Sequence, residues 1–109
     1  MRVGLGISNR YGVSINFCVT FANIVRHIKH ELVLAHDNHF ALDVSRNTVI
    51  RNLLAYNPDK IFIMDSDIIP FKCNKECSIF YDVINYFIDN YSKYDIVGVY
   101  HFSKKLTSN

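Results

Sequence analysis

Apolar residues recur along this chain with two different spacings, and the two spacings alternate from the N-terminus onward. Four short segments contain runs of apolar residues without helical spacing, which is typical of buried β-strands. They cover residues 2–7, 31–35, 60–64 and 95–100. The segment 60–64 (KIFIM) is apolar almost throughout, so we expect both of its faces to be covered, as in a parallel sheet.

Three segments between these strands have apolar residues three and four positions apart, which is the spacing of one helix face. Ser14 is a good N-cap for the first helix, and Ser45 is expected to cap the second after a loop over residues 36–44. The predicted inward faces are Phe17, Cys18, Phe21, Ile24, Val25 and Ile28 in the first helix, Val49, Ile50, Leu53 and Leu54 in the second, and Ile79, Phe80, Val83, Ile84, Phe87, Ile88 and Tyr91 in the third.

Strands and helices therefore alternate, and this order predicts an α/β fold. We expect a three-layer, doubly wound, mostly parallel sheet with helices on both faces, because crossovers between parallel strands are right-handed. No repeat or linker divides the chain. The prediction is a single domain over residues 1–102, followed by a polar tail at residues 103–109.

Composition restricts the partners more than the fold. The 12 Lys and Arg residues nearly balance the 10 Asp and Glu residues, for a net charge of +2. Such a balance does not favour nucleic acid or an anionic membrane as a partner. The apolar runs are far shorter than the roughly 20 residues of a membrane span, and the first residues lack the apolar core of a secretory signal. We therefore expect no membrane span and a cytoplasmic location.

Three cysteines, Cys18, Cys73 and Cys77, are expected to be free thiols, because an odd number does not form a disulfide framework. Cys73 and Cys77 have the spacing of neighbours on a helix face, so a redox or metal pair is the alternative. Further ligands for a zinc site are lacking. His36 and His39 lie in a predicted loop without a third ligand nearby, which favours solvated histidines.

Two acidic residues, Asp65 and Asp67, follow the most strongly predicted strand, with Ser66 between them. In open α/β sheets, ligands bind beyond the carboxyl ends of the strands. Carboxylate oxygens are preferred by Mg²⁺ and Mn²⁺, which usually also bind substrate phosphates. The pair therefore predicts a metal and diphosphate site. In the alternative interpretation, Asp65 caps a turn and Asp67 is solvated, as Asp residues often are after strands.

Three stretches in this order resemble nucleotide-sugar-dependent glycosyltransferases of the GT-A fold, especially small viral and prokaryotic members. They are VSRN at 44–47, IFIMDSDIIP at 61–70 and YDIVGVY at 94–100. The family has an Arg-Asn helix start, a "flDsDi" motif and a following strand similar to "dIVgg.Y". The resemblance covers roughly residues 2–101, and it implies the nucleotide-binding half of a GT-A fold, in a host cytoplasm if the chain is viral.

The resemblance also implies roles for individual residues. Asp65 would lie near the ribose and the metal, and Asp67 would bind Mn²⁺ or Mg²⁺ directly. Arg46 would approach the diphosphate or the sugar of the donor; its planar guanidinium suits phosphate, although a surface arginine covering the helix end is the alternative. Ser8 would help to enclose the base. Donor binding is also implied for Ser66 and Asn47, the latter with helix capping as its alternative.

The resulting hypothesis is a metal-dependent glycosyltransferase, or its donor-binding portion, that transfers a sugar from a nucleotide-diphospho-sugar to an acceptor hydroxyl. Because the chain is short for that family and no acidic residue follows Asp95, no general base is assigned. A haloacid-dehalogenase-type phosphatase is a weaker alternative with Asp65 as nucleophile. The third is a non-catalytic α/β binding or regulatory module, for which a homodimer is an option.

Overall fold

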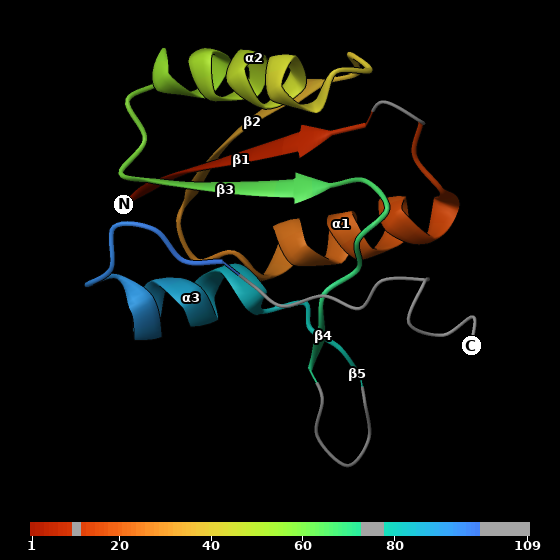
Figure 1. Cartoon of the computed structure of the whole chain (residues 1–109). Helices are drawn as coiled ribbons and strands as arrows, with labels where there is room; N and C mark the ends of the chain where they lie inside the picture. The colour runs from red at the N-terminus through yellow and green to blue at the C-terminus, as the bar shows by residue number, and fades with distance from the viewer. Residues whose placement is uncertain (10–11, 73–77, 99–109) are drawn as a thin grey trace.

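The computed structural model describes residues 1–9, 12–72 and 78–98 of the 109-residue chain. Strands and helices alternate through its first half, as Figure 1 shows. In chain order the elements are β1 (Arg2–Ser8), α1 (Ile15–His27), β2 (Glu31–Asp37), α2 (Leu42–Leu54), β3 (Lys60–Asp65), β4 (Phe71–Lys72), β5 (Ser78–Ile79) and α3 (Val83–Tyr91). The predicted tail at residues 103–109 and the pair Cys73 and Cys77 lie outside the described residues.

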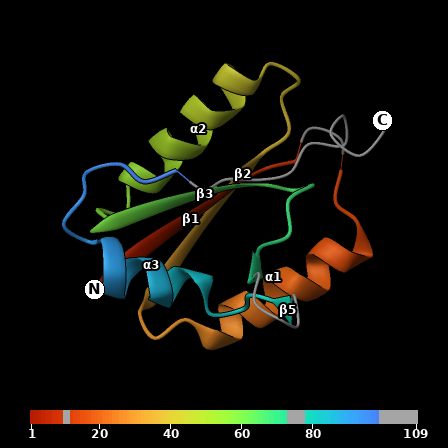
Figure 2. The ribbon, with the colours of Figure 1, turned by 60° about the horizontal axis from the view of Figure 1, so that its bottom comes forward.

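Three strands form one parallel sheet in the order β2-β1-β3, and β4 pairs with β5 in a separate antiparallel hairpin. Helix α2 covers one face of the parallel sheet, whereas α1 and α3 lie on the other face (Figures 1 and 2). The α/β class and the parallel sheet are therefore confirmed. A doubly wound sheet is built from two halves with about three strands each, and this sheet has three strands among the described residues. The three-layer, doubly wound architecture therefore stays a prediction.

Helix α2 lies close to the sheet because β1 has glycines on this face. A Cβ atom at Gly6 would lie 2.1 Å from Cγ1 of Val49 and 3.0 Å from Cδ1 of Ile63. At Gly4 the nearest atom would be Cδ2 of Leu53, at 3.3 Å. Val49 and Leu53 are fully buried, so the two glycines of β1 set the distance at which α2 packs on the sheet.

The opposite face of β1 supports the main hydrophobic core. Val3 and Leu5 alternate with the glycines, as side chains of a strand must, and both are fully buried. They pack with Ile24 of α1 and with Ile84 and Ile88 of α3. Helix α1 begins as predicted, since the Ser14 side chain accepts a hydrogen bond from the backbone N–H of Phe17 at 3.1 Å.

A buried amide joins α1 to α3. The Nδ2 atom of Asn85, a residue that is only 3% exposed, donates to the carbonyl oxygen of His27 and to Oδ1 of Asp82. Its Oδ1 accepts from the backbone N–H of Lys29 at 3.1 Å. Asn85 therefore satisfies two backbone groups at the C-terminal end of α1, the carbonyl of its last residue and an N–H two residues later, where helices leave backbone groups without partners.

Two predicted helix starts are wrong. Helix α2 begins at Leu42 rather than after Ser45, and its N-cap residue, Ala41, makes no side-chain cap bond. Ser45 lies within the first turns of α2, where it is buried and its hydroxyl bonds to that of another buried serine, Ser8. Helix α3 begins at Val83; Ile79 belongs to β5, where backbone pairing with β4 replaces the predicted helix.

The predicted burial of two helix residues and the predicted fourth strand are also wrong. On α1, Cys18 is exposed, whereas Thr20, which was not predicted to face inward, is buried. Leu54 on α2 is likewise exposed. Residues 95–98 form no strand, and Ile96 is 92% exposed; residues 99 and 100 of the predicted strand lie outside the described residues. A β-like sequence becomes a strand only when a neighbouring strand pairs with it, so local pattern overestimated this segment.

Within the described ranges, none of the helices combines the length and apolar character that crossing a membrane requires. This agrees with the expectation of no membrane span.

Candidate functional site

The three parallel strands end level with one another at one edge of the sheet. Ser8 at the end of β1 is in register with Asp37 of β2 and with Asp65 of β3. The backbone then ties the exits together: the N–H of Ser66 donates to the carbonyl of Ser8 at 3.0 Å, and that of Asn9 donates to the carbonyl of Asp37 at 2.9 Å. These backbone hydrogen bonds hold the first residues after β1 and β3 in place at the carboxyl edge of the sheet.

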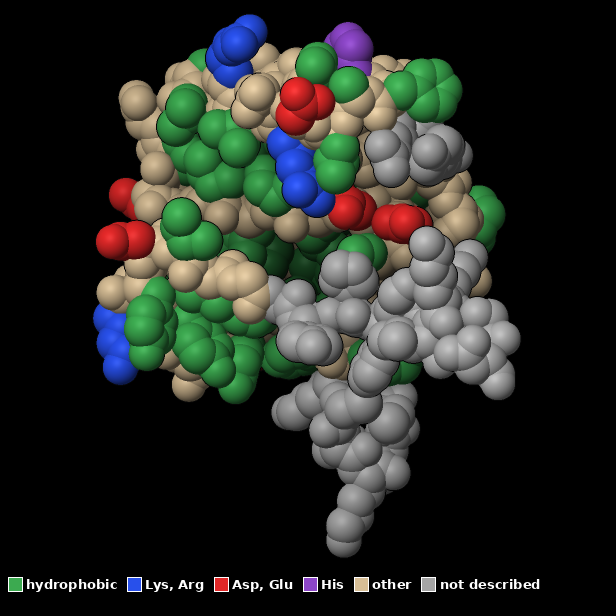
Figure 3. Space-filling view, viewed as in Figure 1, with side chains coloured by type: hydrophobic (Ala, Val, Ile, Leu, Met, Phe, Trp, Pro, Cys, Tyr) green, Lys and Arg blue, Asp and Glu red, His purple; other side chains and the backbone are tan. Residues whose placement is uncertain are grey.

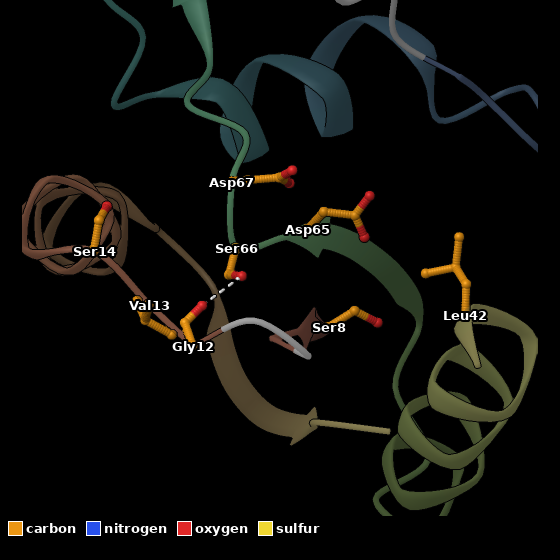
Figure 4. A pocket seen from close by; sticks show the side chains of 8 residues that line it. All are labelled: Ser8, Gly12, Val13, Ser14, Leu42, Asp65, Ser66 and Asp67. Atoms are coloured by element: carbon orange, nitrogen blue, oxygen red, sulfur yellow. Dashed lines mark hydrogen bonds between the residues drawn. The ribbon is translucent and has the colours of Figure 1, made fainter. Parts of the chain in front are cut away.

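A pocket of about 560 Å³ opens at this edge (Figure 4). Its walls come from the ends of β1 and β3, the start of α1 with the loop before it, and the first residue of α2. The lining residues are Ser8, Gly12, Val13, Ser14, Leu42, Asp65, Ser66 and Asp67. The pocket thus brings together four residues that the sequence assigned to one site, from two strands more than 50 positions apart.

Asp65 and Asp67 project to the same side of the chain that leaves β3, whereas Ser66 points the other way (Figure 4). The Ser66 hydroxyl donates to the carbonyl of Gly12 at 3.0 Å. A turn follows, in which the N–H of Ile68 donates to the carbonyl of Asp65 at 3.1 Å. This alternation lets two carboxylates face one ligand while the serine between them fixes the backbone.

The carboxylate of Asp65 has one engaged oxygen and one without a partner. Oδ2 lies 3.3 Å from Nη2 of Arg46 on α2. Oδ1 is buried and makes no hydrogen bond, and the only other buried side-chain oxygen in this condition among the described residues belongs to Asn9. A buried acceptor without a donor costs free energy. The Asp65 oxygen is therefore suited to a cation or a hydrogen-bond donor that enters the pocket.

A buried pair of hydroxyls connects the sheet edge to α2. The oxygens of Ser8 and Ser45 lie 2.9 Å apart, and Ser8 is 5% exposed and Ser45 fully buried. The hydroxyl of Ser45 also lies 3.4 Å from the carbonyl oxygen of Asp37, a long contact. The predicted base-enclosing residue Ser8 therefore lines the pocket while its hydroxyl anchors α2. Sequence analysis took Ser45 for a cap and missed this role.

Asp37 and His39 form a small cluster beside the site. Nδ1 of the His39 ring lies 2.7 Å from Oδ2 of Asp37, and the His39 backbone N–H donates to the same oxygen at 3.0 Å. That backbone hydrogen bond chiefly lowers the pKa of Asp37 below its ordinary value of 3.8, with help from the His39 ring and from Ser45, while burial opposes the shift. His36, which was predicted to lie in the same loop as His39, instead belongs to β2 and is exposed.

The remaining predicted residues divide between the site and the surface. Arg46 is held to the site through Asp65, although it does not line the pocket itself. Asn47 is exposed on α2 and is not among the lining residues. Sequence reasoning missed Val13 and Leu42, whose apolar side chains wall the pocket; no local motif marks them, since only the fold brings loop, helix and strand together.

The donor set fits a hard cation and not a structural zinc ion. Within the part of the chain that the structure describes, no group of three or more His, Cys, Asp or Glu side chains is arranged to hold a metal. Mg²⁺ and Mn²⁺ are commonly held by one or two carboxylates, with water and phosphate oxygens at the other positions. Asp65 and Asp67, with one buried oxygen lacking a partner, match that smaller requirement.

Comparison of the chain with protein-family models, with curated proteins and with solved structures gives no match. The functional interpretation therefore rests on the residues of this chain and on their arrangement.

Proposed function

We propose that this chain binds a nucleotide-diphospho-sugar through a divalent cation, and that it is a glycosyltransferase of the GT-A type or the donor-binding portion of one. The proposal includes a doubly wound architecture, of which β2-β1-β3 with helices on both faces would be one half. One observation carries it: Asp65 has a buried oxygen without a partner beside Asp67, at the pocket where the carboxyl ends of the parallel strands meet.

The residues of the chain divide the work of donor binding. Asp65 and Asp67 would hold Mn²⁺ or Mg²⁺, and the ion, when bound, neutralises charge that develops on a departing nucleoside diphosphate. Arg46 supplies a guanidinium for phosphate oxygens. Ser8 and Ser66 fix the pocket floor through bonds to α2 and to the loop before α1, so the carboxylates are positioned before the donor arrives.

Sugar transfer then requires an acceptor hydroxyl that attacks the anomeric carbon and loses its proton. The bond from that carbon to the diphosphate breaks, and the diphosphate leaves with the electron pair. We assign no general base for the proton within this chain. The proposal for its residues is therefore restricted to donor binding and stabilisation of the leaving group.

A thermal unfolding experiment tests the proposal. Millimolar ADP, GDP and UDP are added singly, with Mn²⁺, with Mg²⁺ or with neither. We expect at least one nucleotide with metal to raise the Tm, because a ligand that binds only the folded state stabilises it. Asp67→Ala should abolish the shift, whereas Asp89→Ala, which removes an exposed carboxylate on α3, should retain it. No shift with any nucleotide and metal would contradict the proposal.

One observation favours the second candidate, a non-catalytic module that forms a homodimer. In the described part of the chain β2 and β3 each have one edge without a strand partner, and Leu34 and Ile63 on these strands are 49% and 36% exposed. Figure 3 shows hydrophobic side chains in the hollow between the helical layers on the side of β3. If this alternative is correct, light scattering after size-exclusion chromatography should give the mass of a dimer, and the thermal unfolding assay should show no shift with any nucleotide.

A further inference from the structure

The ion pair between Arg46 and Asp65 is loose enough to be exchanged. The distance of 3.3 Å between Nη2 and Oδ2 exceeds the roughly 2.7–2.9 Å of a strong charge-assisted hydrogen bond. The side chains of Arg46 and Asp65 are 45% and 28% exposed, so water reaches the pair and weakens it. Nothing in this geometry commits the guanidinium to the carboxylate permanently.

The same carboxylate is the group that a metal would need. A carboxylate offers about four lone-pair sites on two oxygens, and in Asp65 only Oδ2 is engaged while Oδ1 is buried without a partner. A divalent ion on Oδ1 would bring two positive charges next to the guanidinium. Since like charges at such short range repel, binding of the ion and retention of the Arg46 pair oppose each other.

We propose that Arg46 is an internal counter-cation, which pairs with Asp65 in the unliganded protein, is displaced when a divalent ion binds, and then turns to the diphosphate of the donor. This inference rests on the proposed function. Without the ion, the charges of Arg46, Asp65 and Asp67 leave the site net negative, which repels a diphosphate. With the ion the net charge becomes positive. The exchange therefore makes tight nucleotide binding depend on the metal.

The inference predicts effects of opposite sign for one substitution. Arg46→Gln removes the competitor, so Mn²⁺ alone should bind about two- to fivefold more tightly, the range expected for a partly exposed ion pair. The same variant lacks the donor for phosphate. In saturating Mn²⁺ its affinity for a nucleoside diphosphate should fall about tenfold or more, as for the loss of a hydrogen bond to a charged group.

Arg51→Gln is the matched control. Arg51 lies five residues further along α2, is exposed, and makes no ion pair among the described residues. Its replacement removes the same charge from the same helix without touching Asp65, and it should change neither affinity. Asp65→Asn, alone and combined with Arg46→Gln, should abolish Mn²⁺ binding in both backgrounds.

Free Mn²⁺ is followed by electron paramagnetic resonance during titration with each variant, and nucleotide binding by calorimetry with ADP, GDP and UDP. Tighter Mn²⁺ binding together with weaker nucleotide binding by Arg46→Gln alone supports the inference. If the wild type binds Mn²⁺ and nucleotide but Arg46→Gln binds Mn²⁺ no more tightly than Arg51→Gln, the exchange is refuted and the proposed function stands. If wild type and variants bind neither Mn²⁺ nor nucleotide, both are refuted.

Discussion

Replacing Gly6 with alanine should disturb the contact that holds α2 on the sheet. The new Cβ atom would meet Cγ1 of Val49 at 2.1 Å and Cδ1 of Ile63 at 3.0 Å. Val49 cannot simply rotate away, because β-branched side chains are restricted in helices and this one is fully buried. The strand, the helix or both must therefore shift.

The magnitude follows from two opposing effects. Inserting a methyl group into a packed core costs about 1–3 kcal/mol, whereas the loss of glycine flexibility in the unfolded chain recovers about 0.4–1 kcal/mol. We expect Gly6→Ala to lower the free energy of unfolding by about 1–2 kcal/mol. Gly4→Ala is the control: its closest contact would be 3.3 Å, from a Leu53 methyl group, so its effect should be much smaller.

Urea unfolding followed by circular dichroism measures these differences. The double variant Gly6→Ala/Val49→Ala removes the closer of the two clashes, so its loss of stability should be smaller than the sum of the two single losses by about 1 kcal/mol. Full additivity, or a Gly6→Ala protein as stable as the wild type, would show that α2 does not depend on this close approach.

Two further predictions concern other parts of the fold. Asn85→Leu should lower the free energy of unfolding by about 2–4 kcal/mol, because two backbone groups lose their partner, whereas Asn90→Leu, at an exposed amide that bonds only within α3, should cost far less by the same urea assay. Asp37 has a pKa lowered below 3.8 by His39, so the carboxylate stabilises the protein above that pH and loses its effect as the pH falls through the lower pKa of the folded state. The stability difference between the wild type and Asp37→Asn should therefore shrink on acidification below about pH 4, and a difference that stays constant down to pH 2 would contradict the assignment.

Sequence periodicity predicted the elements where burial is regular. The segment 60–64 forms β3 as predicted, but the expectation that both of its faces are covered is wrong, because Ile63 is 36% exposed. The acidic residues after it could be assigned to the sheet edge from the topology of parallel strands alone. Ser14 was predictable as a cap because capping is a local interaction, made with Phe17 three residues on. These features depend on short stretches of chain.

The features that sequence analysis missed depend on contacts between distant residues. Serine is a common N-cap residue, but the hydroxyl of Ser45 pairs with that of Ser8, 37 positions away. Arg46 was predicted to approach the donor, but its pairing with Asp65, 19 positions away, appears only in the folded chain. Residues 95–98 have a strand-like pattern without a pairing partner in the described structure, which no local rule could reveal.

The most direct test of the account is a crystal structure of the protein with Mn²⁺ and a nucleoside diphosphate that stabilises it. Anomalous scattering locates manganese independently of the protein density. We predict an anomalous peak between the carboxylates of Asp65 and Asp67, with diphosphate oxygens completing the coordination and Arg46 turned from Asp65 toward them. A pocket with no anomalous peak, and with Arg46 still paired to Asp65, would contradict the central claim.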